Sequence, residues 1–139
     1  MNWIVASIKW LMLVSGVLTC TMFYAAVAPE AALTSNFGET LEGPVAEIVV
    51  RNWGALIGLV GAMLIYGAYR PASRSLTLVV AAVSKLTFVG LVLLYGRQYL
   101  SHQVGIAITV DSVWVLLFLG YFLGRRNTNG LPGGKGERG

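Results

Sequence analysis

The chain has 139 residues, of which 56% are hydrophobic and only 12% are charged. A soluble domain carries roughly 25% charged residues, so this composition excludes an ordinary water-soluble globule. The formal net charge is +4, and no RNA- or DNA-binding motif accompanies it. We therefore attribute the positive charge to membrane topology and expect no nucleic-acid partner.

The counts of cysteine and histidine exclude several kinds of chemistry. The sequence contains one cysteine and one histidine, so a single chain has no intramolecular disulfide, no CxxC redox pair and no Cys- or His-rich metal site. One histidine also cannot supply two axial ligands to a haem. No Gly-rich phosphate loop and no nucleophile elbow is present. We therefore expect a non-catalytic protein with no metal.

Four apolar segments, each long enough to cross a bilayer, follow one another along the chain. Their approximate bounds are 4–27, 45–69, 75–96 and 106–124. Residues 28–43 separate the first two and are expected to form a short interfacial helix or a packed loop. Pro44 stands where a helix can begin, because the first helical position needs no N–H donor. Pro29 makes 26–28 a poor signal-peptide cleavage site, so we expect the first span to be retained.

The sequence thus predicts an all-α, polytopic membrane protein: one domain, 1–126, forming a bundle of four transmembrane helices. Residues 127–139 are rich in glycine and basic residues and are predicted to form a flexible cytoplasmic tail. If the N-terminus is cytoplasmic, that side carries seven basic residues and the other side two. The seven are Lys9, Arg70, Arg74, Arg125, Arg126, Lys135 and Arg138. The positive-inside rule then places both termini in the cytoplasm of a bacterial-type inner membrane.

Small residues form a stripe on the second apolar segment. Gly54, Gly58 and Gly61 recur at helical spacing, and Gly54 and Gly58 form a GxxxG match. Such stripes let two helix backbones approach closely in lipid. Two alternatives are open: packing inside this chain's own bundle, or contact with another subunit.

The third and fourth predicted spans each contain one charged residue. Lys85 is near the middle of the third span, where a charge costs roughly 2.5–3.5 kcal/mol. Asp111 is the nearest candidate partner, because a short loop makes the third and fourth helices antiparallel neighbours. The two positions differ in depth by roughly 8 Å at 1.5 Å per residue, which a lysine side chain can largely bridge. The pair is either structural or a site for a proton, an anionic headgroup or a quinone carbonyl.

A second polar group is predicted at the outer end of the bundle. Glu47 and Arg51 are four residues apart and face each other on one helix. Arg97 and His102 belong to the last outer loop. Together with Asp111 these residues would form either a polar vestibule for a headgroup or quinone ring, or an ordinary solvated rim.

Four features of the sequence stand out together: the segment Glu47-Ile-Val-Val-Arg51-Asn-Trp-Gly54, the glycine-rich second helix, the longer first outer loop, and Asp111 at the start of the fourth helix. In this combination the chain resembles the DoxX-like superfamily of small bacterial membrane proteins. The resemblance covers about residues 4–124. It implies a four-helix fold, and some members are membrane subunits of thiosulfate:quinone oxidoreductases. By resemblance Glu47, Arg51 and Asp111 are polar contacts, whereas the loop 28–43 and Lys85 depart from the pattern. Sterol-isomerase-like membrane proteins share the topology only.

For function, the sequence favours a non-catalytic accessory or assembly subunit of a larger, redox-linked membrane complex or a homo-oligomer, with the glycine stripe as its interface. The alternative is a quinone- or lipid-binding membrane protein, or a redox enzyme subunit, with Lys85, Asp111, Arg51 and Glu47 at its ligand site. A third alternative is a small transporter. Membrane lipids are partners in every case.

Overall fold

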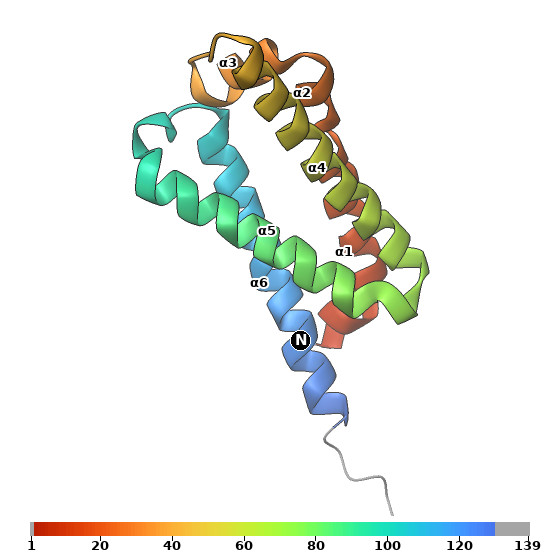
Figure 1. Ribbon diagram of the computed structural model, residues 1–139. Helices are drawn as coiled ribbons and strands as arrows, with labels where there is room; N and C mark the ends of the chain where they lie inside the picture. Colours follow the sequence, from red (N-terminus) through yellow and green to blue (C-terminus); the bar gives the residue numbers. More distant parts are fainter. Residues whose placement is uncertain (1, 130–139) are drawn as a thin grey trace, which may run out of the picture.

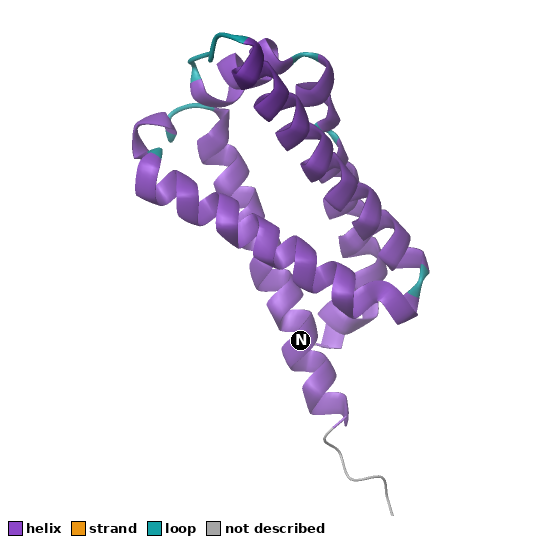
Figure 2. Ribbon diagram, in the orientation of Figure 1, coloured by secondary structure: helices purple, strands orange, loops and turns teal. Residues whose placement is uncertain are grey.

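The computed structural model describes residues 2–129, which are almost entirely helical and contain no strand (Figures 1 and 2). The α-helices are α1 (Asn2–Cys20), α2 (Phe23–Val27), α3 (Pro29–Phe37), α4 (Pro44–Tyr69), α5 (Arg74–Tyr95) and α6 (Gln103–Asn129), with 3-10 turns η1 (Pro71–Ser73) and η2 (Arg97–Tyr99). Four segments are long and apolar enough to cross a membrane: Trp3–Val27, Pro44–Tyr69, Pro71–Tyr95 and Gln103–Arg126. The predicted all-helical architecture with four candidate spans is confirmed.

The first span differs from the continuous helix that we predicted. A turn at residues 21–22 separates α1 from α2. The Thr21 amide and hydroxyl both donate to the Leu18 carbonyl, which tightens the chain into an i→i−3 turn instead of continuing the i→i−4 ladder. After this turn, α2 packs against α4.

The segment between the first two spans forms a nine-residue helix, α3, which lies across one end of the bundle (Figure 1). Gly38 ends α3 with a left-handed φ of 72°, a conformation that glycine adopts without a steric penalty. A Cβ atom at Gly38 would also clash with the His102 ring. Pro44 is the first residue of α4, as its sequence context predicts.

The fourth span extends past its predicted end. We expected the tail to begin at residue 127, but α6 continues to Asn129. Residues 127–129 contain neither glycine nor proline, so nothing in the sequence interrupts the helix before Gly130. The rest of the predicted tail, 130–139, lies outside the described residues.

The core consists of two apolar clusters with a polar layer between them. The larger cluster has Met12, Leu64, Leu78 and Phe118 at its centre. The smaller cluster lies toward α3 and contains Val92, Val104 and Ile108. The residues between them are Ser15 and Thr19 of α1, Lys85 of α5 and Asp111 of α6.

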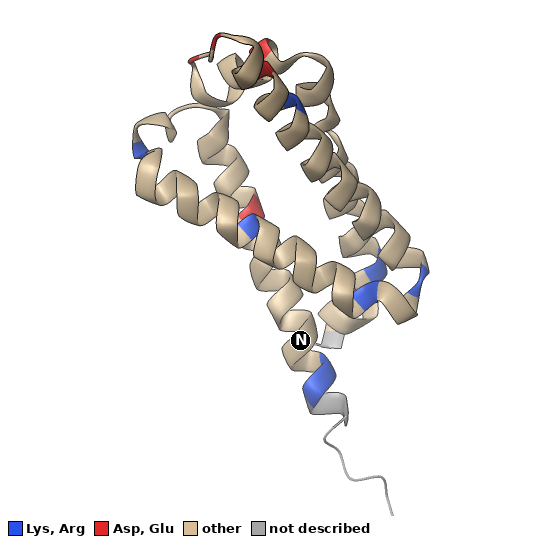
Figure 3. Cartoon of the chain, viewed as in Figure 1, with Lys and Arg blue, Asp and Glu red and all other residues tan. Residues whose placement is uncertain are grey.

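Charge is distributed unequally between the two ends of the bundle (Figure 3). The end that carries α3 has the four glutamates of residues 2–129, together with Arg51 and Arg97. Among the described residues, the opposite end carries only basic charges. These are Lys9, Arg70, Arg74, Arg125 and Arg126.

A polar layer beneath an apolar groove: the candidate functional site

The centre of the candidate site is an ion pair between α5 and α6. Lys85 Nζ lies 2.7 Å from Asp111 Oδ1, and 8% and 21% of the two side chains are exposed. The packing of α5 against α6 brings the two side chains into contact, as we predicted from the short connection between these helices. A lysine at this depth needs such a partner, because an uncompensated charge is costly there.

The third side chain of the layer comes from α1, and we made no prediction for it from the sequence. Lys85 Nζ also donates to Thr19 Oγ1 at 3.4 Å, while the Thr19 hydroxyl donates to the Ser15 carbonyl at 2.7 Å. Ser15 is fully buried, and its Oγ has no hydrogen-bond partner among the described residues. The available signal was the i, i+4 spacing of Ser15 and Thr19 on the face of α1 that also carries Ile8 and Met12.

One helical turn from the ion pair, an apolar groove lies between α4 and α5. Its volume is about 360 Å³. Five aromatic side chains and several aliphatic ones line it: Phe37, Trp53, Phe88, Tyr95, Tyr99, Leu33, Val49, Val50, Leu91 and Val92. Val49, Leu91 and Tyr95 are more than half exposed, so the groove is open along the surface that faces the surrounding medium. Phe88 is three residues from Lys85, which places the inner end of the groove about 4.5 Å along α5 from the polar layer.

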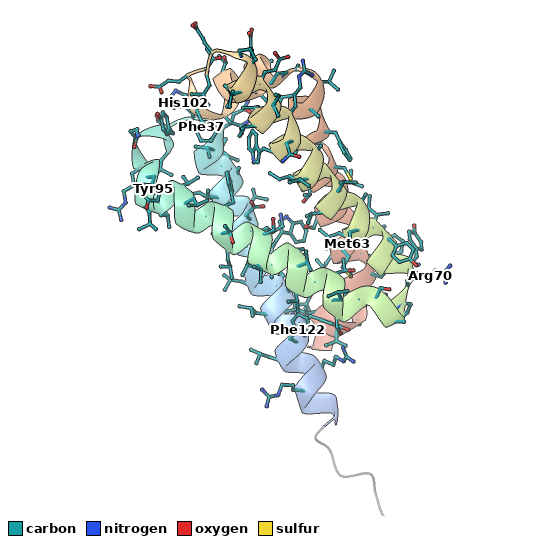
Figure 4. The ribbon with its side chains drawn as sticks, in the orientation of Figure 1. Phe37, Met63, Arg70, Tyr95, His102 and Phe122 are labelled. Carbon is teal, nitrogen blue, oxygen red and sulfur yellow. The ribbon has the colours of Figure 1, made fainter. Side chains whose placement is uncertain are left out.

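A polar contact closes the end of the groove that is farther from the ion pair. The Tyr99 hydroxyl donates to Glu39 Oε2 at 2.8 Å, and the Tyr99 ring meets Phe37 edge-on with centroids 5.4 Å apart. The hydrogen bond to Glu39 raises the pKa of Tyr99 above its ordinary value, since it stabilises the neutral phenol. Figure 4 shows Phe37 and His102 at this end of the molecule.

Glu47 and Arg51 form a separate group. Arg51 donates twice to Glu47 Oε1, at 2.7 and 3.0 Å, and its Nη1 donates to the carbonyls of Ala26 and Val27 at the end of α2. The guanidinium therefore fastens α2 to α4 through carbonyls that the helix end leaves unsatisfied.

The single polar vestibule that the sequence allowed is not formed. A cavity of about 690 Å³ does lie beside Arg51 and Glu47, with Glu30 and Glu42 in its wall, but Asp111 is not among its lining residues, because Asp111 is held by Lys85 in the polar layer. Neither of the other two expected members lines this cavity. Arg97 donates to the Leu93 carbonyl, and His102 lies against Gly38.

The glycine stripe of α4 packs against α1 and α2 of the same chain. A Cβ atom at Gly54 would lie 2.6 Å from Ala25 Cβ, one at Gly58 2.6 Å from the Phe23 ring, and one at Gly61 2.6 Å from the Cys20 amide nitrogen. The stripe therefore serves packing within the bundle. It is already covered and cannot be the surface that meets another subunit.

No family model, no curated protein and no solved structure matches this chain. Among the described residues, no group of three or more His, Cys, Asp or Glu side chains could hold a metal ion. The candidate site is accordingly defined by its geometry alone.

Proposed function

We propose that this protein is a multi-pass protein of a bacterial-type inner membrane that binds a membrane-soluble amphiphile in the groove between α4 and α5. The single observation that carries the proposal is the aromatic-lined groove, whose apolar wall ends one turn from a buried cation. Ligand sites combine such apolar surface with a few polar groups in the same way. The basic end of the bundle supports a cytoplasmic location for both termini.

The polar layer limits the chemistry of the ligand. A lysine ammonium has three N–H donors, and Lys85 uses two of them on Asp111 and Thr19. The third donor and the unpartnered hydroxyl of Ser15 lie in one layer and favour a group that accepts hydrogen bonds. A quinone carbonyl or a lipid ester has this chemistry and also carries an apolar body that fits the groove.

The accessory-subunit hypothesis rested on the small size of the chain, the absence of cofactor ligands and the glycine stripe as an interface. Of these three arguments the stripe no longer supports it, because α1 and α2 cover the stripe. The resemblance to the DoxX-like superfamily, with its quinone-linked members, favours the ligand-binding proposal, and membership of that superfamily remains part of the proposal.

The test uses groove-filling variants of the full chain. Native mass spectrometry of protein gently released from its own membranes records bound small molecules and copurifying chains. Leu91 and Leu86 are both on α5 and are 53% and 54% exposed, but only Leu91 lines the groove. We expect Leu91→Trp to lose a bound amphiphile that the wild type and Leu86→Trp retain.

Equal ligand retention by the two tryptophan variants would overturn the groove as the binding site. A wild-type protein without any bound amphiphile, but with a stoichiometric foreign chain, would restore the accessory-subunit hypothesis. Extraction in the presence of added ubiquinone or phospholipid then distinguishes the two candidate ligand classes.

A further inference from the structure

The basic end of the bundle contains an aromatic platform built by two helices. Lys9 Nζ of α1 lies 4.8 Å from the centroid of the Tyr69 ring of α4 and 5.7 Å from that of Trp10. Trp10 and Tyr69 are 65% and 61% exposed. A cation over an aromatic face is attracted to the ring without losing its donors to other partners, so the ammonium remains able to bind an anion.

A second cation, Arg70, directly follows Tyr69 at the end of α4. The Arg70 guanidinium lies 5.9 Å from the centroid of the Tyr66 ring, and Figure 4 shows Arg70 projecting away from the bundle at the end of α4. Arg74 behaves differently, because its guanidinium donates to the Gly67 and Ala68 carbonyls. Arg74 thus completes the end of α4, whereas Lys9 and Arg70 face outward over rings.

Neither outward cation has an acidic partner in the part of the chain that the structure describes. The two ion pairs there are Arg51–Glu47 and Lys85–Asp111, and the four glutamates of residues 2–129 belong to the other end. The exposed faces below the platform are apolar, with Val14 of α1 and Leu59 of α4 each more than half exposed. The local arrangement therefore has positive charge and aromatic rings above an apolar helix surface.

We propose that Lys9, Trp10, Tyr66, Tyr69 and Arg70 form a binding site for the headgroup phosphate of an anionic phospholipid. Lys9 and Arg70 bind the phosphate, the tyrosine and tryptophan rings lie at headgroup level, and the acyl chains follow the exposed faces of α1 and α4. The charge complementarity of two unpaired cations identifies the occupant. This site is at the opposite end of the bundle from the groove, so each can fail without the other.

The experiment compares lipid binding by the full chain in mild detergent, with phosphatidylglycerol and phosphatidylcholine as probes and native mass spectrometry as the readout. Lys9→Gln/Arg70→Gln removes the two cations. Its control is Arg97→Gln/Arg126→Gln, which removes the same charge from one residue at each end of the bundle, both outside the proposed site. At about 1 kcal/mol per basic residue near an anionic surface, we expect phosphatidylglycerol to bind about 30-fold more weakly to the first variant. Phosphatidylcholine should bind both alike.

Equal loss in the control variant would overturn the proposal, since it would show a response to net charge alone. Equal binding of the two lipids by the wild type would also overturn it. Glycerol phosphate is the soluble competitor. If it displaces the lipid fully at equal concentration, the site binds phosphate without lipid specificity, which contradicts the proposed occupant.

A charge-conserving variant is the second control. Lys9→Arg/Arg70→Lys keeps both charges and should bind like the wild type. If the neutralised variant does not fold, each single Gln variant should lose about fivefold.

Discussion

Thr19 of α1 accepts a hydrogen bond from Lys85 of α5 at 3.4 Å, and the same ammonium lies 2.7 Å from Asp111 of α6. One cation therefore joins three of the four candidate membrane spans at a single level of the bundle. Removal of either contact should therefore weaken the packing between helices that are distant in the sequence.

The ion pair should behave as one unit. Lys85→Met or Asp111→Asn alone leaves a partner uncompensated and should cost roughly 3 kcal/mol, the lower end of the range for a buried pair, because 21% of the Asp111 side chain is exposed. The double variant should recover a large part of this loss. Free energies of unfolding in micelles, combined in a double-mutant cycle, measure the coupling. Strictly additive losses would show that the pair contributes no interaction.

Substitution of Ser15 should change stability and ligand binding in opposite directions. Its buried Oγ has no partner among the described residues, so Ser15→Ala should stabilise the ligand-free protein by about 1 kcal/mol, since a buried hydroxyl without a hydrogen bond carries a desolvation cost. The same variant should bind the proposed amphiphile more weakly. Thermal unfolding with and without added ligand measures both effects. A destabilised, ligand-free Ser15→Ala protein would mean that the hydroxyl is already satisfied.

The glycines of α4 and α5 should respond oppositely to alanine. At Gly61, a Cβ would lie 2.6 Å from the Cys20 amide nitrogen and 2.7 Å from the Gly16 carbonyl oxygen, whereas at Gly90 nothing lies within 4 Å. Gly61→Ala should therefore destabilise the bundle by roughly 1–3 kcal/mol. Gly90→Ala should stabilise it by up to about 1 kcal/mol through helix propensity. Similar changes at both positions would argue against close contact between α1 and α4.

Substitution of Arg51 should destabilise the protein more than substitution of Glu47, its partner in the ion pair. Glu47→Gln weakens a pair whose side chains are 43% and 54% exposed and should cost less than about 1 kcal/mol. Arg51→Gln also removes the hydrogen bonds to the Ala26 and Val27 carbonyls, so its cost should reach about 2 kcal/mol. Melting temperatures of the two variants provide the comparison. A larger loss for Glu47→Gln would contradict the capping role.

Tyr99 should ionise later than an ordinary tyrosine. The hydrogen bond to Glu39 raises its pKa in the folded protein, so folding favours the protonated phenol. The stabilisation is fully present below the ordinary tyrosine pKa of about 10 and is lost as the pH rises through the higher folded value. Phenolate absorbance, compared between the wild type and Tyr99→Phe, isolates this residue. In Glu39→Gln the titration of Tyr99 should move to lower pH.

Sequence patterns predicted the helices well because apolar length and Pro/Gly punctuation are local properties. These patterns predicted that Pro44 begins α4. They also predicted that Lys85 pairs with Asp111, because the connection between α5 and α6 is short. They did not predict the turn at residues 21–22, since Thr21 competes for a backbone carbonyl inside an uninterrupted apolar run.

The site was only partly predictable for a different reason. Thr19 reaches Lys85 across 66 residues of sequence, and no local spacing encodes which faces of α1 and α5 meet. The groove also arises from distant segments, because Phe37, Trp53 and Phe88 come from three helices. Such arrangements depend on tertiary packing, which a composition or periodicity does not specify.

The polar layer has a consequence for biogenesis. Lys85 precedes Asp111 by 26 residues, so it emerges from the ribosome first and cannot meet its carboxylate until Asp111, the ninth residue of α6, has also emerged. By then α1 and α4 are already available to pack along the glycine stripe. We expect α5 to remain at the insertion machinery until α6 has been made. The two helices should then enter the lipid together as a hairpin that packs against α1 and α4.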